Sequence, residues 1–266
     1  MNKEQENSAV FAGEASILKG KGMIAVISGG HGYGKTWFSL NLAHALSLLK
    51  QKVLLFDGDT GYYNSKSQLG LNNTKDLSST IYGNSSLNQI VYTYDKGRFD
   101  IISGNSKTSG LSNMSIGRLQ ILGDDLDILA HNYNKILLDA GIGLTRYAGV
   151  LTGMAQSVII LCLDTPQSIT ESFELVKIIK SRYSKTKINI VINQVNTVTD
   201  GERAYMMLDR ACRKFLDFSP NLLGIIRQDT RVRDSIRNQS TIISRYPQSE
   251  ASVDIVVIAK RILENE

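Results

Sequence analysis

The chain has 266 residues and a mass of 29.4 kDa; 42% of its residues are hydrophobic and 21% are charged. This composition is that of an ordinary globular protein and excludes a disordered, collagen-like or disulfide-rich chain. Lys and Arg (30) outnumber Asp and Glu (25), so the net charge of +5 permits an acidic partner, nucleic acid or anionic membrane without requiring one. The two cysteines, Cys162 and Cys212, provide neither a disulfide framework nor a Cys-rich metal site.

The N-terminal residues are polar and lack the apolar stretch of a signal peptide. No apolar run approaches the roughly 20 residues that cross a bilayer. We therefore expect a soluble cytoplasmic protein without an intrinsic membrane helix. Residues 1–20 are expected to form a flexible N-terminal segment and residues 21–266 a single domain, because no strong linker or internal repeat divides the chain.

Short apolar, β-branched runs alternate along the chain with longer stretches of helical periodicity. This alternation predicts an α/β fold in which helices cover both faces of a mostly parallel, twisted β-sheet. Strands are predicted at Met23–Ser28, Lys52–Phe56, Phe99–Ile102, Lys135–Leu138, Val158–Leu161, Ile188–Ile192 and Leu222–Ile226. Helices are predicted at Lys35–Lys50, Ser115–Asn132, Ser168–Tyr183, Gly201–Leu216 and Ser249–Leu263, with surface connections around Asn72–Ser86 and Ser103–Ser115.

A glycine-rich segment after the first predicted strand carries the strongest functional signal. Residues Gly29 to Thr36 match the pattern G-x-x-x-x-G-K-[ST] between a predicted strand and a predicted helix, which is the context of a phosphate-binding P-loop. Lys35 is expected to bridge the β- and γ-phosphates, and the Thr36 hydroxyl to bind Mg²⁺. The alternative is a glycine-rich turn without a ligand. The residues expected to bind the cofactor here are Gly29, Gly30, His31, Gly32, Tyr33, Gly34, Lys35, Thr36 and Trp37.

Carboxylates follow two further predicted strands. Asp57 and Asp59 leave the second strand two residues apart, so both can face the crevice at the carboxyl ends of the strands. One can hold the water shell of the metal while the other orients the attacking water. Asp139 ends another apolar run, as a Walker B carboxylate does when it binds Mg²⁺. A solvated Asp-Gly turn at Asp57 is the alternative.

The motifs in this order resemble those of the MinD/ParA-type ATPases, and most closely the FlhG/FleN branch that controls flagellar number and placement. The segments that carry the resemblance are Gly29–Thr36, Asp57–Asn64 (similar to D-x-D-x-G-x-x-N), Asp164–Glu171 (similar to D-x-P-x-S-I-T-D) and Tyr246–Ser252. The resemblance implies that Lys35, Asp57 and Asp59 are catalytic and that Thr36, Asp57 and Asp139 hold the metal. It also implies that Asn193 reads the adenine, although an asparagine at a strand end can instead cap a turn.

The resemblance implies ATP or ADP and Mg²⁺ as cofactors, and an ATP-dependent homodimer that hydrolysis returns to monomers. The implied partners are an FlhF-like GTPase or a flagellar transcriptional activator. Recruitment of the cytoplasmic protein to the inner membrane or cell pole would then occur through a partner.

Some residues depart from the family pattern. Gly30 stands where the family P-loop K-G-G-V-G-K-[ST] has a lysine that reaches the partner's phosphates, which favours weaker dimerisation and turnover. Arg227 replaces a proline after the last strand. The end of the chain, Leu263-Glu264-Asn265-Glu266, is unlike a basic membrane-targeting helix.

Two alternative functions follow from these observations. Gly30 motivates a scaffold that binds nucleotide but hydrolyses it poorly. A possible cationic surface motivates a ParA-like partition ATPase that binds DNA nonspecifically, although interleaved acids favour a solvated helix face. That surface consists of Arg203, Arg210, Arg213, Lys214, Arg231, Arg233 and Arg237.

Overall fold

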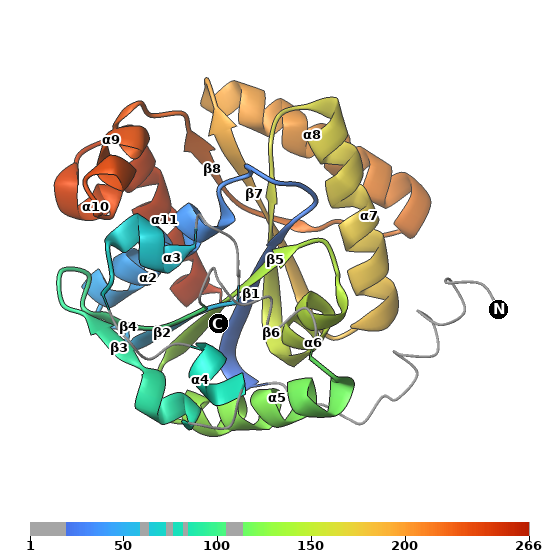
Figure 1. Cartoon of the computed structure of the whole chain (residues 1–266). Helices are drawn as coiled ribbons and strands as arrows, with labels where there is room; N and C mark the ends of the chain where they lie inside the picture. The colour runs from blue at the N-terminus through green and yellow to red at the C-terminus, as the bar shows by residue number, and fades with distance from the viewer. Residues whose placement is uncertain (1–19, 59–63, 73–76, 82–84, 105–113, 266) are drawn as a thin grey trace.

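A central β-sheet organises the computed structural model, which describes residues 20–58, 64–72, 77–81, 85–104 and 114–265 (Figure 1). Its strand order is β3-β4-β2-β5-β1-β6-β7-β8. The strands are parallel, apart from the antiparallel pair of β3 and β4. They are β1 (Gly20–Ser28), β2 (Val53–Asp57), β3 (Tyr92–Tyr94), β4 (Phe99–Ser103), β5 (Lys135–Ile142), β6 (Ala155–Cys162), β7 (Lys187–Val195) and β8 (Asn221–Arg227). The predicted α/β fold class is confirmed.

Helices cover both faces of this sheet (Figure 1). On one face lie α5 (Ile116–Ala130), α6 (Arg146–Met154), α7 (Pro166–Arg182) and α8 (Val198–Leu216). On the other lie α2 (Lys35–Leu48), α3 (Ser65–Leu69), α9 (Arg231–Arg237), α10 (Ile242–Arg245) and α11 (Glu250–Glu264). Two short elements, α4 (Leu77–Ile81) and the 3₁₀ helix η1 (Leu87–Ile90), occupy the chain between β2 and β3.

The alternation of side chains along β1 shows how the sheet separates two hydrophobic cores. Met23, Ala25 and Ile27 face the α5–α8 layer, whereas Ile24 and Val26 face the layer of α2 and α11. All five are buried. A strand that is buried on both faces is apolar throughout, which explains why the central strands are recognisable in the sequence.

Helix α2 is buried around almost its whole circumference, and polar contacts fix it to the α10 region. The Asn41 side chain accepts a hydrogen bond from the Ile242 backbone N–H (2.9 Å), and Nδ1 of His44 lies 2.7 Å from the Thr241 hydroxyl. Because α2 starts at the P-loop, these contacts also hold the phosphate-binding segment relative to α9 and α10.

Several details differ from the sequence predictions. Strand β3 was not predicted because it has three residues and two of them, Tyr92 and Thr93, are exposed. The expected surface connection around Asn72–Ser86 contains α4, whose Leu77 is buried. Residues 1–19 of the expected flexible segment lie outside the described residues. Within the described chain, no helix combines the length and apolarity needed to span a membrane.

Candidate nucleotide-binding site

The P-loop joins β1 to α2 at the centre of the sheet. Gly32 and Gly34 have φ angles of +77° and +85°, which side-chain-bearing residues rarely adopt. Gly34 precedes α2, and the first turn of that helix has neither a side-chain cap nor an acidic residue. The amides at the start of α2 are therefore available to an anion.

The two residues that open α2 point to separate parts of the site. Nζ of Lys35 donates a hydrogen bond to Oγ of Ser28 (3.0 Å), and the hydroxyl of Thr36 donates one to Oδ2 of Asp139 (2.7 Å). The side chains of Lys35, Thr36 and Asp139 are all buried. The structure thus brings together three residues that are expected from the sequence to bind phosphate and metal.

Asp57 lies beside Asp139 because β2 and β5 are neighbours, with these two residues opposite each other in register. Both carboxylates are fully buried. Oδ2 of Asp57 also accepts the backbone N–H of Ser65 (2.7 Å), at the start of α3. Asp59, the expected water-orienting residue, lies outside the described residues.

These oxygen atoms fit a Mg²⁺ ion bound together with phosphate. The Thr36 hydroxyl and the two carboxylates are the hard oxygen donors that Mg²⁺ prefers. The described residues contain no cluster of three or more His, Cys, Asp or Glu side chains that could hold a metal unaided. A Mg²⁺ site here would therefore be completed by water and phosphate oxygens, as is usual for this ion.

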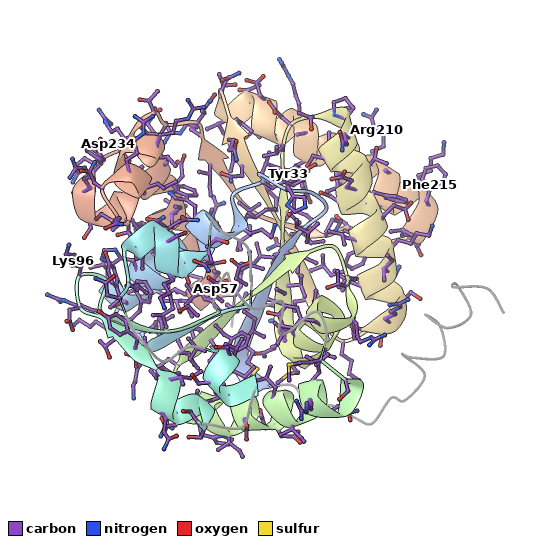
Figure 2. The ribbon with its side chains drawn as sticks, viewed as in Figure 1. Tyr33, Asp57, Lys96, Arg210, Phe215 and Asp234 are labelled. Carbon is purple, nitrogen blue, oxygen red and sulfur yellow. The ribbon has the colours of Figure 1, made fainter. Side chains whose placement is uncertain are left out.

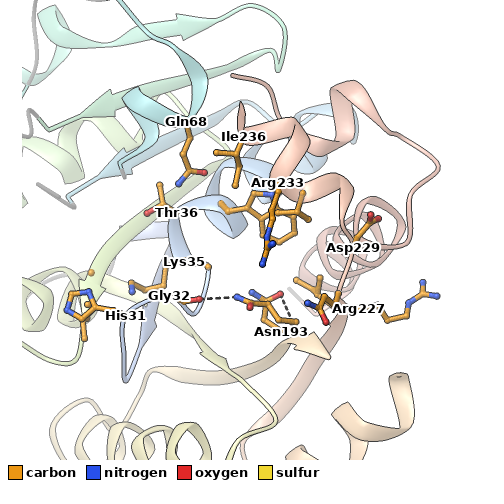
Figure 3. Close-up of a pocket in the computed structure, with 18 residues that line it drawn as sticks. His31, Gly32, Lys35, Thr36, Gln68, Asn193, Arg227, Asp229, Arg233 and Ile236 are labelled. Carbon is orange, nitrogen blue, oxygen red and sulfur yellow. Dashed lines mark hydrogen bonds between the residues drawn. The ribbon is translucent and has the colours of Figure 1, made fainter. Parts of the chain in front are cut away.

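A cavity of about 690 Å³ opens beside the P-loop (Figure 3). This volume is in the range of small-molecule sites. Its walls come from six parts of the chain: the P-loop with the start of α2, α3, the end of β5, the end of β7, the end of β8 with the segment after it, and α9. They are lined by His31, Gly32, Gly34, Lys35, Thr36, Trp37, Gln68, Gly141, Ile142, Asn193, Gln194, Ile226, Arg227, Gln228, Asp229, Val232, Arg233 and Ile236.

Comparison with known protein families identifies this arrangement. The model of the CobQ/CobB/MinD/ParA nucleotide binding domain matches residues 24–242, which include the P-loop, both carboxylate-bearing strands and α9. The chain belongs to this family.

Two relatives align with most of this chain. The antiactivator FleN of Pseudomonas aeruginosa is 28% identical over 90% of this chain and 85% of its own length. The flagellum site-determining protein YlxH of Helicobacter pylori is 25% identical over 89% of this chain and 80% of its own length. Among solved structures, MinD of Pyrococcus horikoshii in complex with Mg-ADP has a TM-score of 0.77 at 21% identity, covering 90% of this chain and 95% of that one.

Asn193, the residue expected to read adenine, lies in the wall of the cavity and holds the P-loop of this MinD/ParA-family domain. Its Nδ2 donates to the Tyr33 carbonyl (2.8 Å), and its Oδ1 accepts the Gln194 backbone N–H (3.0 Å). Nε2 of Gln194, whose own φ is +61°, donates to the Gly32 carbonyl (3.0 Å). A carboxamide has two N–H donors and two acceptor lone pairs, so Asn193 retains one of each for a ligand. Its contact with adenine stays a prediction.

The P-loop is also fixed to α7, by a contact that the sequence did not reveal. The Tyr33 hydroxyl donates a hydrogen bond to Oε2 of Glu171 (2.6 Å). Burial and this hydrogen bond raise the pKa of Tyr33, and the same bond lowers the pKa of Glu171. The Tyr33 ring lies over Gly30, because a Cβ atom built on Gly30 would be 2.9 Å from Cζ of the tyrosine. The space beside Gly30, where the resemblance implies a lysine, is therefore filled by an aromatic ring.

The Arg227 side chain, at a position where the resemblance implies a proline, points away from the cavity (Figure 3). Its guanidinium donates to both oxygens of Asp254 (2.8 and 3.0 Å) and to Oε1 of Glu250 (2.6 Å). These carboxylates raise the pKa of Arg227, with the Asp254 hydrogen bond contributing most. Arg227 thus fixes the last strand to α11.

The cationic residues considered for DNA binding are divided between two helices. Four lie on α8 and three on α9. On α8, Arg203 pairs with Asp200 (3.6 Å) and Arg213 with Asp209 (2.7 Å). On α9, Arg233 lines the cavity. We therefore do not propose DNA binding for this surface.

Proposed function

We propose that this chain is a Mg²⁺-dependent ATPase switch of the MinD type that regulates flagellar number or placement. The observation that carries the proposal is the hydrogen bond between the Thr36 hydroxyl and the Asp139 carboxylate, which places two oxygen ligands beside Lys35 at the start of α2. The similarity to FleN and YlxH over most of the chain supports the flagellar role.

In this proposal the P-loop amides and Lys35 bind the β- and γ-phosphates. Thr36, Asp57 and Asp139 would hold Mg²⁺ directly or through water, and the bound ion would supply positive charge to the phosphates. Asp59 orients a water molecule for attack on the γ-phosphorus. The bond from that phosphorus to the β,γ-bridging oxygen breaks, giving ADP and inorganic phosphate. Because this chemistry depends mainly on positioning and charge, the buried side chains around Lys35 suit it.

The proposed switch is the association of two chains when ATP is bound and their separation after hydrolysis. Its proposed partners are an FlhF-like GTPase or a flagellar transcriptional activator, and recruitment from the cytoplasm to the inner membrane or a pole would occur through such a partner. Asn193 is proposed to contact the adenine with its remaining donor and acceptor.

Phosphate release under Mg-ATP tests the proposed chemistry. Lys35→Ala should lower turnover at least 100-fold, because it removes the buried cation of the phosphate site. Lys96→Ala is the matched control, because Lys96 is exposed between β3 and β4 (Figure 2) and does not line the cavity. This variant should turn over ATP like the wild type. Equal rates for Lys35→Ala and the wild type would overturn the proposed activity.

The flagellar role needs a separate test in the source organism. Deletion of the gene should change the number or position of flagella per cell, counted by electron microscopy, and the wild-type gene should restore the pattern while Lys35→Ala should not. An unchanged pattern in the deletion strain would overturn this part of the proposal.

Gly30 favours a second candidate, a scaffold that binds nucleotide but hydrolyses it poorly. The Tyr33 ring occupies the space beside Gly30, so this position supplies no cation to a partner's phosphates. If calorimetry shows tight Mg-ATP binding while wild type and Lys35→Ala release phosphate at the same background rate, the scaffold is the better description.

A further inference from the structure

We propose that Arg233, on α9, binds the phosphates of the nucleotide in this cavity. The inference rests on the proposed function, because it assigns an additional residue to the same site. It adds a cation from a helix that lies more than 190 residues after the P-loop in the sequence and that the P-loop pattern does not include.

Three strongly basic residues contribute atoms to the lining of the cavity: Lys35, Arg227 and Arg233. Lys35 is already hydrogen bonded to Ser28 in the P-loop. Arg227 is bound by Asp254 and Glu250 and is directed away from the cavity. In the described part of the chain, Arg233 has neither a carboxylate within ion-pair distance nor a hydrogen-bonded side-chain partner, so its guanidinium donors remain available to a ligand.

The direction of Arg233 is visible in Figure 3. Its side chain extends from α9 into the cavity, and its nitrogen atoms lie toward the middle, between the Lys35 side and the Asn193 side. A nucleotide with its terminal phosphates at Lys35 and its base near Asn193 has its innermost phosphate in this central region. A guanidinium binds phosphate oxygens through short, charge-assisted hydrogen bonds.

The surroundings of Arg233 support this orientation. Its helix neighbours Val232 and Ile236 line the same cavity, as does Trp37 from α2, so the aliphatic stem of the arginine can pack on apolar surface while its charged end reaches the ligand. Among the described residues that line the cavity, only Asp229 carries a carboxylate. Its Oδ1 accepts the backbone N–H of Arg231 (2.9 Å) rather than a hydrogen bond from the Arg233 guanidinium.

Helix α9 is held firmly enough to aim this side chain. Asp234, next to Arg233, accepts hydrogen bonds from Nε of Arg245 (2.6 Å) and from the Tyr246 hydroxyl (2.6 Å). These bonds join α9 to α10 and the segment after it. The adjacent α10 is in turn fixed to α2 through Asn41 and His44. The side of the cavity that carries Arg233 is thus connected to the helix that carries Lys35.

The experiment uses Trp37, the single tryptophan of the chain, as a fluorescent reporter of binding because it lines the cavity. The affinities of Mg-ADP, AMP and adenosine are compared for wild type, Arg233→Gln and Arg233→Lys. The matched control is Arg237→Gln, one turn further along α9, which removes an exposed arginine that does not line the cavity. Thermal unfolding without ligand establishes that all four proteins are folded.

Arg233→Gln should weaken Mg-ADP and AMP binding about tenfold to a hundredfold, the range of a charge-assisted hydrogen bond, and leave adenosine binding unchanged. Arg233→Lys should lose less, and Arg237→Gln should bind like the wild type. Unchanged ADP affinity in Arg233→Gln, or an equal loss for adenosine, would overturn the phosphate contact while leaving the proposed function intact. Failure of the wild type to bind any nucleotide would overturn the proposed function and this inference with it.

Discussion

The packing of Tyr33 over Gly30 leads to a prediction about two neighbouring positions in the P-loop. Replacing Gly30 with alanine adds a single Cβ atom, which would lie 2.9 Å from Cζ, 3.0 Å from the hydroxyl oxygen and 3.1 Å from Cε1 of Tyr33. Ordinary contacts begin near 3.4 Å, so the ring must move by about half an ångström. Because the ring is buried and its hydroxyl bonds Glu171 at 2.6 Å, that movement strains or breaks the hydrogen bond.

We expect Gly30→Ala to lower the free energy of unfolding by about 2 kcal/mol, combining overpacking of a buried ring with loss of a hydrogen bond to a charged group. For a chain of this size the melting temperature should fall by about 4–8 °C. In a Tyr33→Ala background the same substitution should be close to neutral. The coupling energy of the double-mutant cycle should therefore be about 2 kcal/mol, close to the whole effect of the single substitution.

The assay is thermal unfolding monitored by circular dichroism, without nucleotide. Gly117→Ala is the control, because a Cβ atom there meets no atom within 4 Å and alanine favours the surrounding helix α5. It should leave stability unchanged or raise it by up to about 1 kcal/mol. If Gly30→Ala is as stable as wild type, or if its effect is the same with and without Tyr33, the account of this P-loop is refuted.

Three further predictions concern the packing that supports the site. Burial, followed by the charge of Arg98, lowers the pKa of His44 from 6.5 to about 4, so the neutral ring stabilises the fold above pH 6.5 and that stability is lost as the pH falls through 4. Between pH 6.5 and 4 the free energy of unfolding of the wild type, measured by urea titration, should fall by up to about 3 kcal/mol more than that of His44→Gln. Parallel pH profiles of stability for the two proteins would contradict the reasoning. Thr36→Val should lower the free energy of unfolding, measured by thermal unfolding, by about 1.5–3 kcal/mol, because it removes a hydrogen bond to the buried carboxylate of Asp139. Thr36→Ser should retain this hydrogen bond. Equal stability of the two variants would contradict the prediction. Arg227→Ala should lower the free energy of unfolding by about 1–2 kcal/mol, because it breaks a partly exposed ion pair with Asp254. The loss should be smaller in an Asp254→Asn background. Strictly additive losses would show that the ion pair contributes nothing.

The sheet and the phosphate end of the site could be predicted because their signals are local. Apolar runs such as Val53–Phe56 belong to strands buried on both faces, and the P-loop pattern constrains eight consecutive residues. Asp57 and Asp139 each follow an apolar run, and the neighbouring parallel strands β2 and β5 bring them together in register. Asp57 ends β2, whereas β5 continues to Ile142, beyond the predicted strand end at Leu138. Helices α7 and α8 begin before their predicted starts, although the sequence carries the signals for both. The N-cap Thr165 is followed by a proline at the first position of α7, and the Thr197 side chain caps α8 by accepting the backbone N–H of Asp200.

The remaining parts of the site depend on contacts between distant segments. Tyr33 and Glu171 are 138 residues apart, so no local pattern indicates their hydrogen bond. The resemblance places Asn193 at the adenine base, whereas its hydrogen bond to the P-loop could not be predicted from its position near the end of β7. Arg233 belongs to a seven-residue helix with three arginines, and only the placement of α9 shows which of them faces the cavity.

The most direct test of the proposed switch is the molar mass in solution, measured by light scattering without nucleotide, with Mg-ADP and with a non-hydrolysable Mg-ATP analogue. The account predicts a monomer of 29.4 kDa in the first two conditions and a doubling of the mass only with the ATP analogue. A monomer under all three conditions, with the analogue shown to be bound, would contradict an ATP-dependent dimer and leave a nucleotide-binding scaffold as the better account.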